Sequence, residues 1–294
     1  MATARDLRRR IRSIKNTSQI TKAMQMVAAA KMRKAQMAAL AGRPYAELLN
    51  RVLAEVSHAA GDFSHPLLEA RRVHRRAVIL VSTDKGLCGA LNSNLFREAL
   101  KYDTATTLFI AAGRKGAQFV ARTKRQLEGV FEYKDAPRMS EARSIVEFAT
   151  NLFLAGKVDQ VDVLFTNFIS TLNQKAESRT LLPIGKLQAV SADFQGERLH
   201  GDLAKATGEF LFEPGAAQVF EALLPHYLNF LMYQYLLEAK ASEHSARMVA
   251  MKNATDNALQ LIKSLTLQYN KMRQAAITKE LLEITSAAKA MEAS

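Results

Sequence analysis

The chain has 294 residues, of which 48% are hydrophobic, so it can bury a sizeable core, and this composition excludes an intrinsically disordered protein. Its longest aliphatic run, residues 77–81, is far shorter than the roughly 20 apolar residues that a membrane-spanning helix needs. The chain has one cysteine, Cys88, and no apolar signal core near its N-terminus, so we expect a protein of a reducing compartment.

The net charge is +13, and residues 1–57 alone carry +9 of it. Such a local excess of Lys and Arg predicts an acidic partner, which can be nucleic acid, a membrane surface or an acidic protein loop.

Residues 1–57 are predicted to form an N-terminal coiled-coil helix that starts near Thr3, with a break at Gly42-Arg43-Pro44. Small and polar residues dominate the seam, meaning the positions at alternating spacings of three and four that face a partner helix. The seam of this helix is Leu7, Ile11, Ile14, Ser18, Thr21, Gln25, Ala28, Met32, Ala35 and Ala39.

Residues 58–215 are predicted to form a small α/β domain. Apolar strands are expected at 77–82, 107–112 and 161–169, helices around 93–100, 115–122 and 139–154, and weaker strands at 127–133 and 178–184. Strands that alternate with helices indicate a mostly parallel, Rossmann-like sheet covered by helices.

Residues 216–294 are predicted to form a second coiled-coil helix, because steps of three and four continue from Phe220 to Ala276. Its seam is Phe220, Leu223, Tyr227, Phe230, Gln234, Leu237, Ala241, His244, Met248, Met251, Thr255, Ala258, Ile262, Leu265, Tyr269, Met272 and Ala276. These residues would span ~85 Å as one helix, whereas a compact globule of this length has a diameter of about 50 Å.

Both long helices meet the middle domain at their inner ends, so they can pack on each other only as an antiparallel coiled coil. The C-terminal helix is the longer one, which leaves roughly residues 269–290 without a partner in the chain. That stretch contains Leu281 and Ile284, and an apolar surface without an internal partner indicates an interaction site.

Three stretches of sequence resemble the F-type ATP synthase gamma subunits. The first is Gln19-Ile20-Thr21-Lys22-Ala23-Met24, with its neighbours from Arg9 to Ala29. The second is Val81-Ser82-Thr83-Asp84-Lys85-Gly86-Leu87-Cys88-Gly89. The third comprises Ala246-Arg247-Met248-Val249-Ala250-Met251-Lys252 and the segment from Tyr269 to Leu281.

The resemblance implies a rotating central stalk that couples proton or sodium flow to ATP synthesis or hydrolysis and has no catalytic site or cofactor of its own. The implied partners are the hexamer of alpha and beta subunits, the epsilon subunit and the membrane ring of c subunits, on the cytoplasmic face of a bacterial plasma membrane. Membrane association would arise only through this complex, and nucleic acid would not be a partner. Residues that match family positions for partner contact or coupling are Lys22, Met24, Arg247, Gln274, Thr278 and Glu280. Arg247 could equally be an ordinary exposed helix residue.

Two alternatives start from the same residues. The basic N-terminal segment also suits a nucleic-acid-binding coiled coil, although no known binding module is present. The parallel sheet also suits a small enzyme, but Lys85 and Gly86 do not stand in the order of a phosphate-binding P-loop, and the histidines lack metal-ligand spacing. We therefore expect residues 82–89 to form a structural turn and Cys88 to be a buried apolar residue. His244, on the seam, is expected to be a packed neutral histidine or to set the register of the helix.

Overall fold

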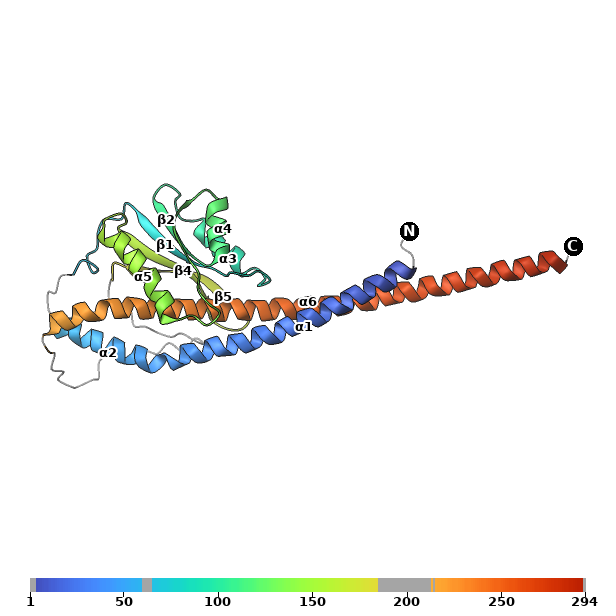
Figure 1. Cartoon of the computed structure of the whole chain (residues 1–294), viewed down its shortest axis with the longest axis horizontal. Helices are drawn as coiled ribbons and strands as arrows, with labels where there is room; N and C mark the ends of the chain where they lie inside the picture. Colours follow the sequence, from blue (N-terminus) through green and yellow to red (C-terminus); the bar gives the residue numbers. More distant parts are fainter. Residues whose placement is uncertain (1–3, 60–64, 185–212, 214, 293–294) are drawn as a thin grey trace. The chain divides into compact units, whose positions relative to one another are not determined.

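The computed structural model describes residues 4–59, 65–184, 213 and 215–292 (Figure 1). The chain divides into two compact units. The helix-pair unit consists of residues 1–27 and 250–294, and the sheet unit consists of residues 28–249. The predicted division into segments 1–57, 58–215 and 216–294 stays a prediction.

The described elements follow one another as α1 (Ala4–Ala41), α2 (Arg43–Ala59), β1 (Arg76–Val81), α3 (Leu91–Ala99), β2 (Thr107–Ala112), α4 (Arg114–Arg122), β3 (Gln126–Phe131), α5 (Met139–Leu154), β4 (Gln160–Phe168), β5 (Gln174–Leu182) and α6 (Ala216–Glu292). The strands predicted at 77–82, 107–112 and 161–169 are β1, β2 and β4, each within one residue of its expected ends. The predicted start of the first helix at Thr3 and the last two residues of the chain lie outside the described residues.

The sheet has the strand order β3-β2-β1-β4-β5 (Figure 1). β1 pairs in parallel with β2 and β4, and β2 pairs in parallel with β3, which confirms the predicted mostly parallel sheet. β5 runs antiparallel to β4 and begins four residues before the strand predicted at 178–184. Only a short turn joins β4 to β5, and a connection of that length permits antiparallel pairing but no parallel crossover.

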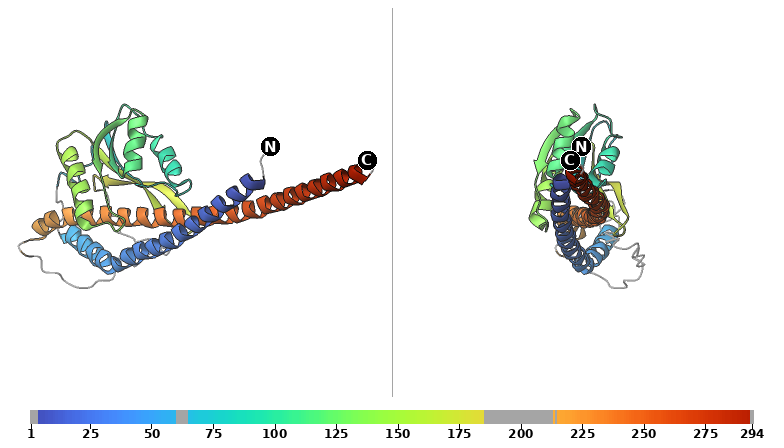
Figure 2. Two further views of the ribbon diagram at one scale, coloured as in Figure 1. Left: turned by 45° about the vertical axis from the view of Figure 1, so that its right-hand side comes forward. Right: turned by 90° about the vertical axis from the view of Figure 1, so that its right-hand side faces the viewer.

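Helices cover both faces of this sheet, as parallel strands require. In the left view of Figure 2 the strands lie between α5 on one side and α3 and α4 on the other. The core under α3 and α4 contains Val78, Leu80, Leu95, Ala99, Phe109, Val120 and Leu164. The core on the opposite face includes Ile79, Val81, Ile110, Ile145, Ala149, Val163, Phe165, Leu228 and Leu236. The first part of α6 is therefore built into the core of the sheet unit.

The predicted break in the N-terminal helix is confirmed at Gly42, which separates α1 from α2. Pro44 stands in the first turn of α2, where a missing backbone N–H costs no helical hydrogen bond. Just past the break, the Tyr45 ring lies 4.9 Å from the ring of Phe230 on α6.

Within the sheet unit, the apolar clusters shared with α6 show that α1 and α2 run antiparallel to α6. Met32 and Ala39 share a cluster with Leu237 and Ala241, whereas the later residues of α2 pack with the earlier residues of α6. Residues later in α1 and α2 thus pack against residues earlier in α6, as the predicted antiparallel pairing requires.

Candidate functional site

The predicted seam forms the buried side of α6 in the helix-pair unit. Its members there are buried or half-buried from Met251 to Tyr269, and every other residue in that stretch except Ala254 is exposed. The polar seam position Thr255 is satisfied by a hydrogen bond of 2.7 Å between its hydroxyl and that of Thr21 on α1. Thr255 is therefore accommodated in the seam with its hydroxyl paired.

Lys22 and Met24 lie beside this seam on α1. Lys22 is exposed and Met24 is half-buried. Arg8, Arg12 and Lys15 are exposed as well, so a row of basic side chains beside the seam faces solvent. These side chains are accessible to an acidic partner.

The end of α6 presents apolar side chains to solvent. From Thr266 to Ser286 every residue except the half-buried Tyr269 is exposed. Its exposed large apolar residues are Leu267, Met272, Ile277, Leu281, Leu282 and Ile284. An apolar helix surface without a partner among the described residues is the surface that a second protein would cover.

The predicted contact residues Gln274, Thr278 and Glu280 lie on this exposed end of α6. Gln274 and Thr278 stand one turn apart, and the Thr278 hydroxyl donates to the Gln274 carbonyl oxygen at 2.9 Å. All three belong to the helix-pair unit, as do Lys22 and Met24, whereas Arg247 belongs to the sheet unit.

Arg247 is buried, with 9% of its surface exposed, so the alternative of an ordinary exposed residue is wrong. Its guanidinium donates to the carbonyl oxygen of Gly86 at 3.2 Å and to that of Lys85 at 3.4 Å. It also pairs with the Glu243 carboxylate at 2.8 Å. Arg247 thus binds the loop after β1 to α6.

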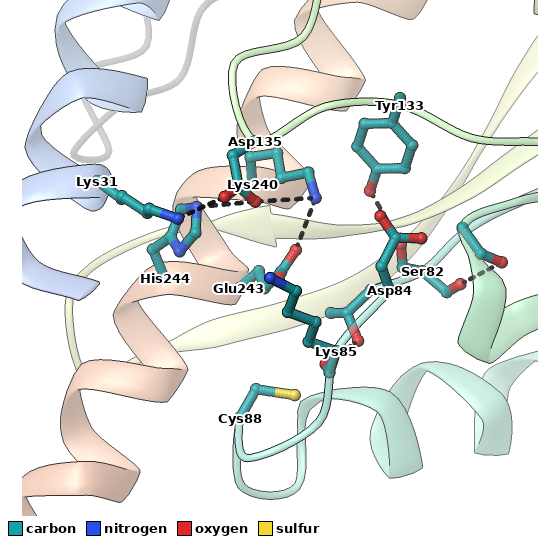
Figure 3. Close-up of polar contacts among 12 residues, drawn as sticks. Lys31, Ser82, Asp84, Lys85, Cys88, Tyr133, Asp135, Lys240, Glu243 and His244 are labelled. Atoms are coloured by element: carbon teal, nitrogen blue, oxygen red, sulfur yellow. Dashed lines mark hydrogen bonds and ion pairs between the residues drawn. The ribbon is translucent and has the colours of Figure 1, made fainter. Parts of the chain in front are cut away.

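Arg247 also belongs to a polar cluster around α6, which we call the polar junction. Lys240 and His244 are buried in it, whereas Lys31 and Asp135 are partly exposed (Figure 3). Its members are Lys31, Tyr133, Asp135, Lys240, Glu243, His244 and Arg247. Lys240 has 1% of its side chain exposed and pairs with Glu243 at 3.1 Å and Asp135 at 3.8 Å. Asp135 also accepts a hydrogen bond from Lys31 of α1.

Asp135 and His244 of the polar junction have pKa values that differ from their ordinary ones. The hydrogen bond from Lys31, with further attraction from Lys240, lowers the pKa of Asp135. Burial lowers the pKa of His244 from 6.5 to about 4, so the imidazole is neutral near pH 7, as predicted. Arg247 lies 3.3 Å from His244 Nδ1 and can only donate, so Nδ1 is the acceptor and Nε2 carries the proton.

The loop that begins at Ser82 holds the N-terminus of α4 in place. The backbone N–H of Gly116 donates to the Ser82 hydroxyl at 2.7 Å, that of Lys115 to the Thr83 carbonyl at 3.0 Å, and that of Arg114 to the Asp84 carboxylate at 3.0 Å. A phosphate-binding helix N-terminus leaves such N–H groups free for its ligand. The loop therefore acts as a structural cap.

Cys88 is buried at 2% exposure in this loop. Burial raises the pKa of its thiol, which Arg247 only partly offsets. A protonated thiol is a poor nucleophile, in keeping with the predicted packing role.

Among the described residues, no cluster of three or more His, Cys, Asp or Glu side chains has an arrangement that could hold a metal ion. None of the helices in the described part of the chain is long and apolar enough to cross a membrane.

Sequence reasoning missed the polar junction. One signal was available: Lys240, Glu243 and Arg247 are spaced by three and four residues and so share one face of a helix. Their partner Asp135, in the loop after β3, lies more than 100 residues away along the chain, and no local pattern indicates that pairing.

A family model described as ATP synthase matches residues 3–291 of the chain. The ATP synthase gamma chain of Opitutus terrae is 49% identical over 289 residues, which cover 98% of each chain. The chain belongs to the ATP synthase gamma chain family. The gamma chain of Methylacidiphilum infernorum is 45% identical, with 99% of this chain and 100% of the relative covered.

A solved structure of the Euglena gracilis mitochondrial ATP synthase, comprising OSCP, F1 and the c-ring, contains a chain with the same fold. The TM-score is 0.67 at 20% identity, with 99% of this chain and 95% of that chain covered. Membership of the gamma chain family confirms the predicted non-catalytic subunit of ATP synthase, and the comparisons do not support the nucleic-acid-binding alternative.

Proposed function

We propose that this chain is the rotating shaft of an F-type ATP synthase on the cytoplasmic face of a bacterial plasma membrane. The end of α6 enters the hexamer of alpha and beta subunits, and the sheet unit engages the epsilon subunit and the ring of c subunits. Ion flow turns the ring, and the chain passes that rotation to the beta subunits, which carry out the chemistry.

The observation that carries this proposal is the exposed apolar end of α6. Leu281, Leu282 and Ile284 are each more than half exposed, which is costly in water unless another protein covers them. Family membership supplies the identity of that protein, since the relatives are named as chains of ATP synthase.

The six residues matched to the family are assigned two roles within the proposal. Lys22, Met24, Gln274, Thr278 and Glu280 contact beta subunits, because their side chains lie on accessible helix surfaces in the helix-pair unit. Arg247 instead tunes coupling by holding the loop after β1 against α6, since its guanidinium is already bound to Lys85, Gly86 and Glu243.

The proposal is tested by reconstitution. Purified chain is mixed with alpha and beta subunits, the hexamer is fixed to a surface, and a bead is attached to the sheet unit through cysteine at Leu172, which is 82% exposed. Cys88, at 2% exposure, will not compete for the label. We expect ATP-dependent rotation of the bead, and exclusion of the chain from an otherwise intact hexamer would reject the shaft.

A matched pair of variants tests whether the apolar end of α6 makes the contact. Ile284→Glu replaces an apolar side chain, 65% exposed in the free chain, with a charged one, so we expect a smaller fraction of the chain to enter the hexamer. Thr285→Glu adds the same charge one residue along, at an exposed polar position, and should enter normally. Equal loss in both variants would show that added charge, rather than apolar contact, is responsible.

A further inference from the structure

The polar junction connects three parts of the sheet unit. Lys31 belongs to α1, Tyr133 and Asp135 follow β3, and Lys240 belongs to α6. In Figure 3 the Lys240 ammonium points between the carboxylates of Asp135 and Glu243. It also lies 4.4 Å from the centre of the Tyr133 ring.

The connections continue to the loop after β1. The Tyr133 hydroxyl donates to the carbonyl oxygen of Ser82 at 2.9 Å. Glu243 joins Lys240 to Arg247, and Arg247 binds the carbonyl oxygens of Lys85 and Gly86. The loops after β1 and after β3 are thus both held to α6, and the loop after β3 is also held to α1.

Apolar packing between α1 and α6 at this level combines several alanines with larger side chains, and Tyr233 and Met248 pack against the buried cluster. The shared cluster consists of Met32, Ala35, Ala39, Phe168, Leu237 and Ala241, and three of these are alanines with few side-chain atoms. Hydrophobic contact is non-directional, whereas charge-assisted hydrogen bonds have a defined geometry. Lys240 and Glu243 are buried, whereas Lys31 and Asp135 are partly exposed. Ion pairs of either kind add little net stability, so the role we assign to these pairs is to fix one specific arrangement.

We propose that Lys240 and Asp135 are positioning residues that lock the sheet to both shaft helices, so that twist applied to the sheet reaches α1 and α6 without slip. This inference rests on the proposed function. Asp135 is the shared element, because its carboxylate binds Lys31 of α1 and Lys240 of α6 at the same time.

Torsional stiffness is the readout that distinguishes this role from a contribution to stability alone. With the hexamer fixed and no ATP present, the angular variance of the bead at Leu172→Cys reports the compliance between the sheet and the held helices. Lys240→Met keeps the stem over Tyr133 but removes the charge, and Asp135→Asn keeps the shape of the carboxylate. We expect each variant to raise the variance about twofold or more.

Lys101→Met is the matched control, because it removes one positive charge from an exposed pair that Lys101, just after α3, makes with Glu98. We expect it to leave the variance at the wild-type value. Asp135 is half exposed, so Asp135→Asn should fold even where loss of the buried Lys240 charge prevents folding.

A second measurement uses the free chain and so does not depend on assembly. Spin labels at Lys34 of α1 and Leu172 of the β4–β5 turn are both in the sheet unit and both exposed. Asp135→Asn should broaden their distance distribution, and Lys101→Met should not.

Each outcome separates the two proposals. Rotation of the wild-type chain with unchanged variance and unchanged label distances in Asp135→Asn would overturn the lock and leave the shaft standing. If the wild-type chain never enters the hexamer, the shaft is rejected. A broader distance distribution in Asp135→Asn would then still show that Asp135 holds α1 against the sheet, but without any role in transmitting torque. A rise in variance with Lys240→Met alone would also overturn the lock, because the proposal requires Asp135.

Discussion

Replacing His244 with glutamine should make the stability of the sheet unit less sensitive to acid. The folded protein holds the His244 pKa at about 4, below its ordinary value of 6.5, because burial disfavours the imidazolium. The charged groups that face it are Asp135 and Glu243, which favour the imidazolium, and Lys240 and Arg247, which oppose it. Glutamine can still accept a hydrogen bond from Arg247 and cannot be protonated.

The sign follows from proton binding in the two states. Between pH 6.5 and about 4 the unfolded chain binds a proton at His244 that the folded chain rejects. The resulting destabilisation is absent above pH 6.5 and grows as the pH falls towards 4. About 1.5 pH units separate pH 5 from the pKa of His244 in the unfolded chain. The wild type should therefore lose about 2 kcal/mol of unfolding free energy relative to His244→Gln between pH 7 and pH 5.

The assay is urea unfolding of both proteins at the two pH values, followed by circular dichroism and tyrosine fluorescence. The chain has no tryptophan, and Tyr133 and Tyr235 are buried in the sheet unit. Comparing the two proteins at each pH cancels the titration of the carboxylates that they share. An equal loss of stability in both proteins between pH 7 and pH 5 would refute the argument that His244 is held neutral by burial.

Three further outcomes are expected. Leu265→Ala should lower the free energy of unfolding of the helix-pair unit by about 2 kcal/mol or more, because Leu265 is a buried seam residue, whereas Leu267→Ala at an exposed position should leave it nearly unchanged in urea titrations. Gly113→Ala should lower the free energy of unfolding by about 1–3 kcal/mol or more, since φ is +101° and a Cβ would lie 2.3 Å from the Ser82 carbonyl oxygen. Gly86→Ala, with open space around the glycine, is the control. Equal melting curves for the two variants would contradict the clash. Met24→Lys should assemble normally but pump about twofold fewer protons per ATP, and normal pumping by reconstituted vesicles would count against contact between Met24 and the beta subunits.

The sequence predicts the regular elements well, because their signals are local. The spacing of Thr255, Ile262 and Leu265 correctly marks the buried side of α6, and Gly42 with Pro44 marks the break between α1 and α2. Side-chain spacing along a helix determines which residues share a face, so this part follows from the order of residues alone.

Burial of Arg247 and the pairing of Asp135 with Lys31 and Lys240 could not be predicted in the same way. These contacts depend on how the sheet docks against the helices, which brings together residues far apart in the chain. The antiparallel direction of β5 was also left open, because strand propensity carries no direction and only the short turn after β4 decides it.

The built-in position of α6 has a consequence for synthesis of the chain on the ribosome. Leu53 of α2 shares a core with Leu228 and Leu236 of α6, on the face of the sheet opposite α3 and α4. The two α6 residues are synthesised about 175 residues after Leu53. At an elongation rate of about 5–20 residues per second this corresponds to roughly 10 to 35 seconds during which the apolar side of α2 has emerged without its final partner. The N-terminal half must therefore stay soluble and unaggregated while it waits, and we expect a nascent chain that stops before residue 216 to be a substrate for ribosome-associated chaperones.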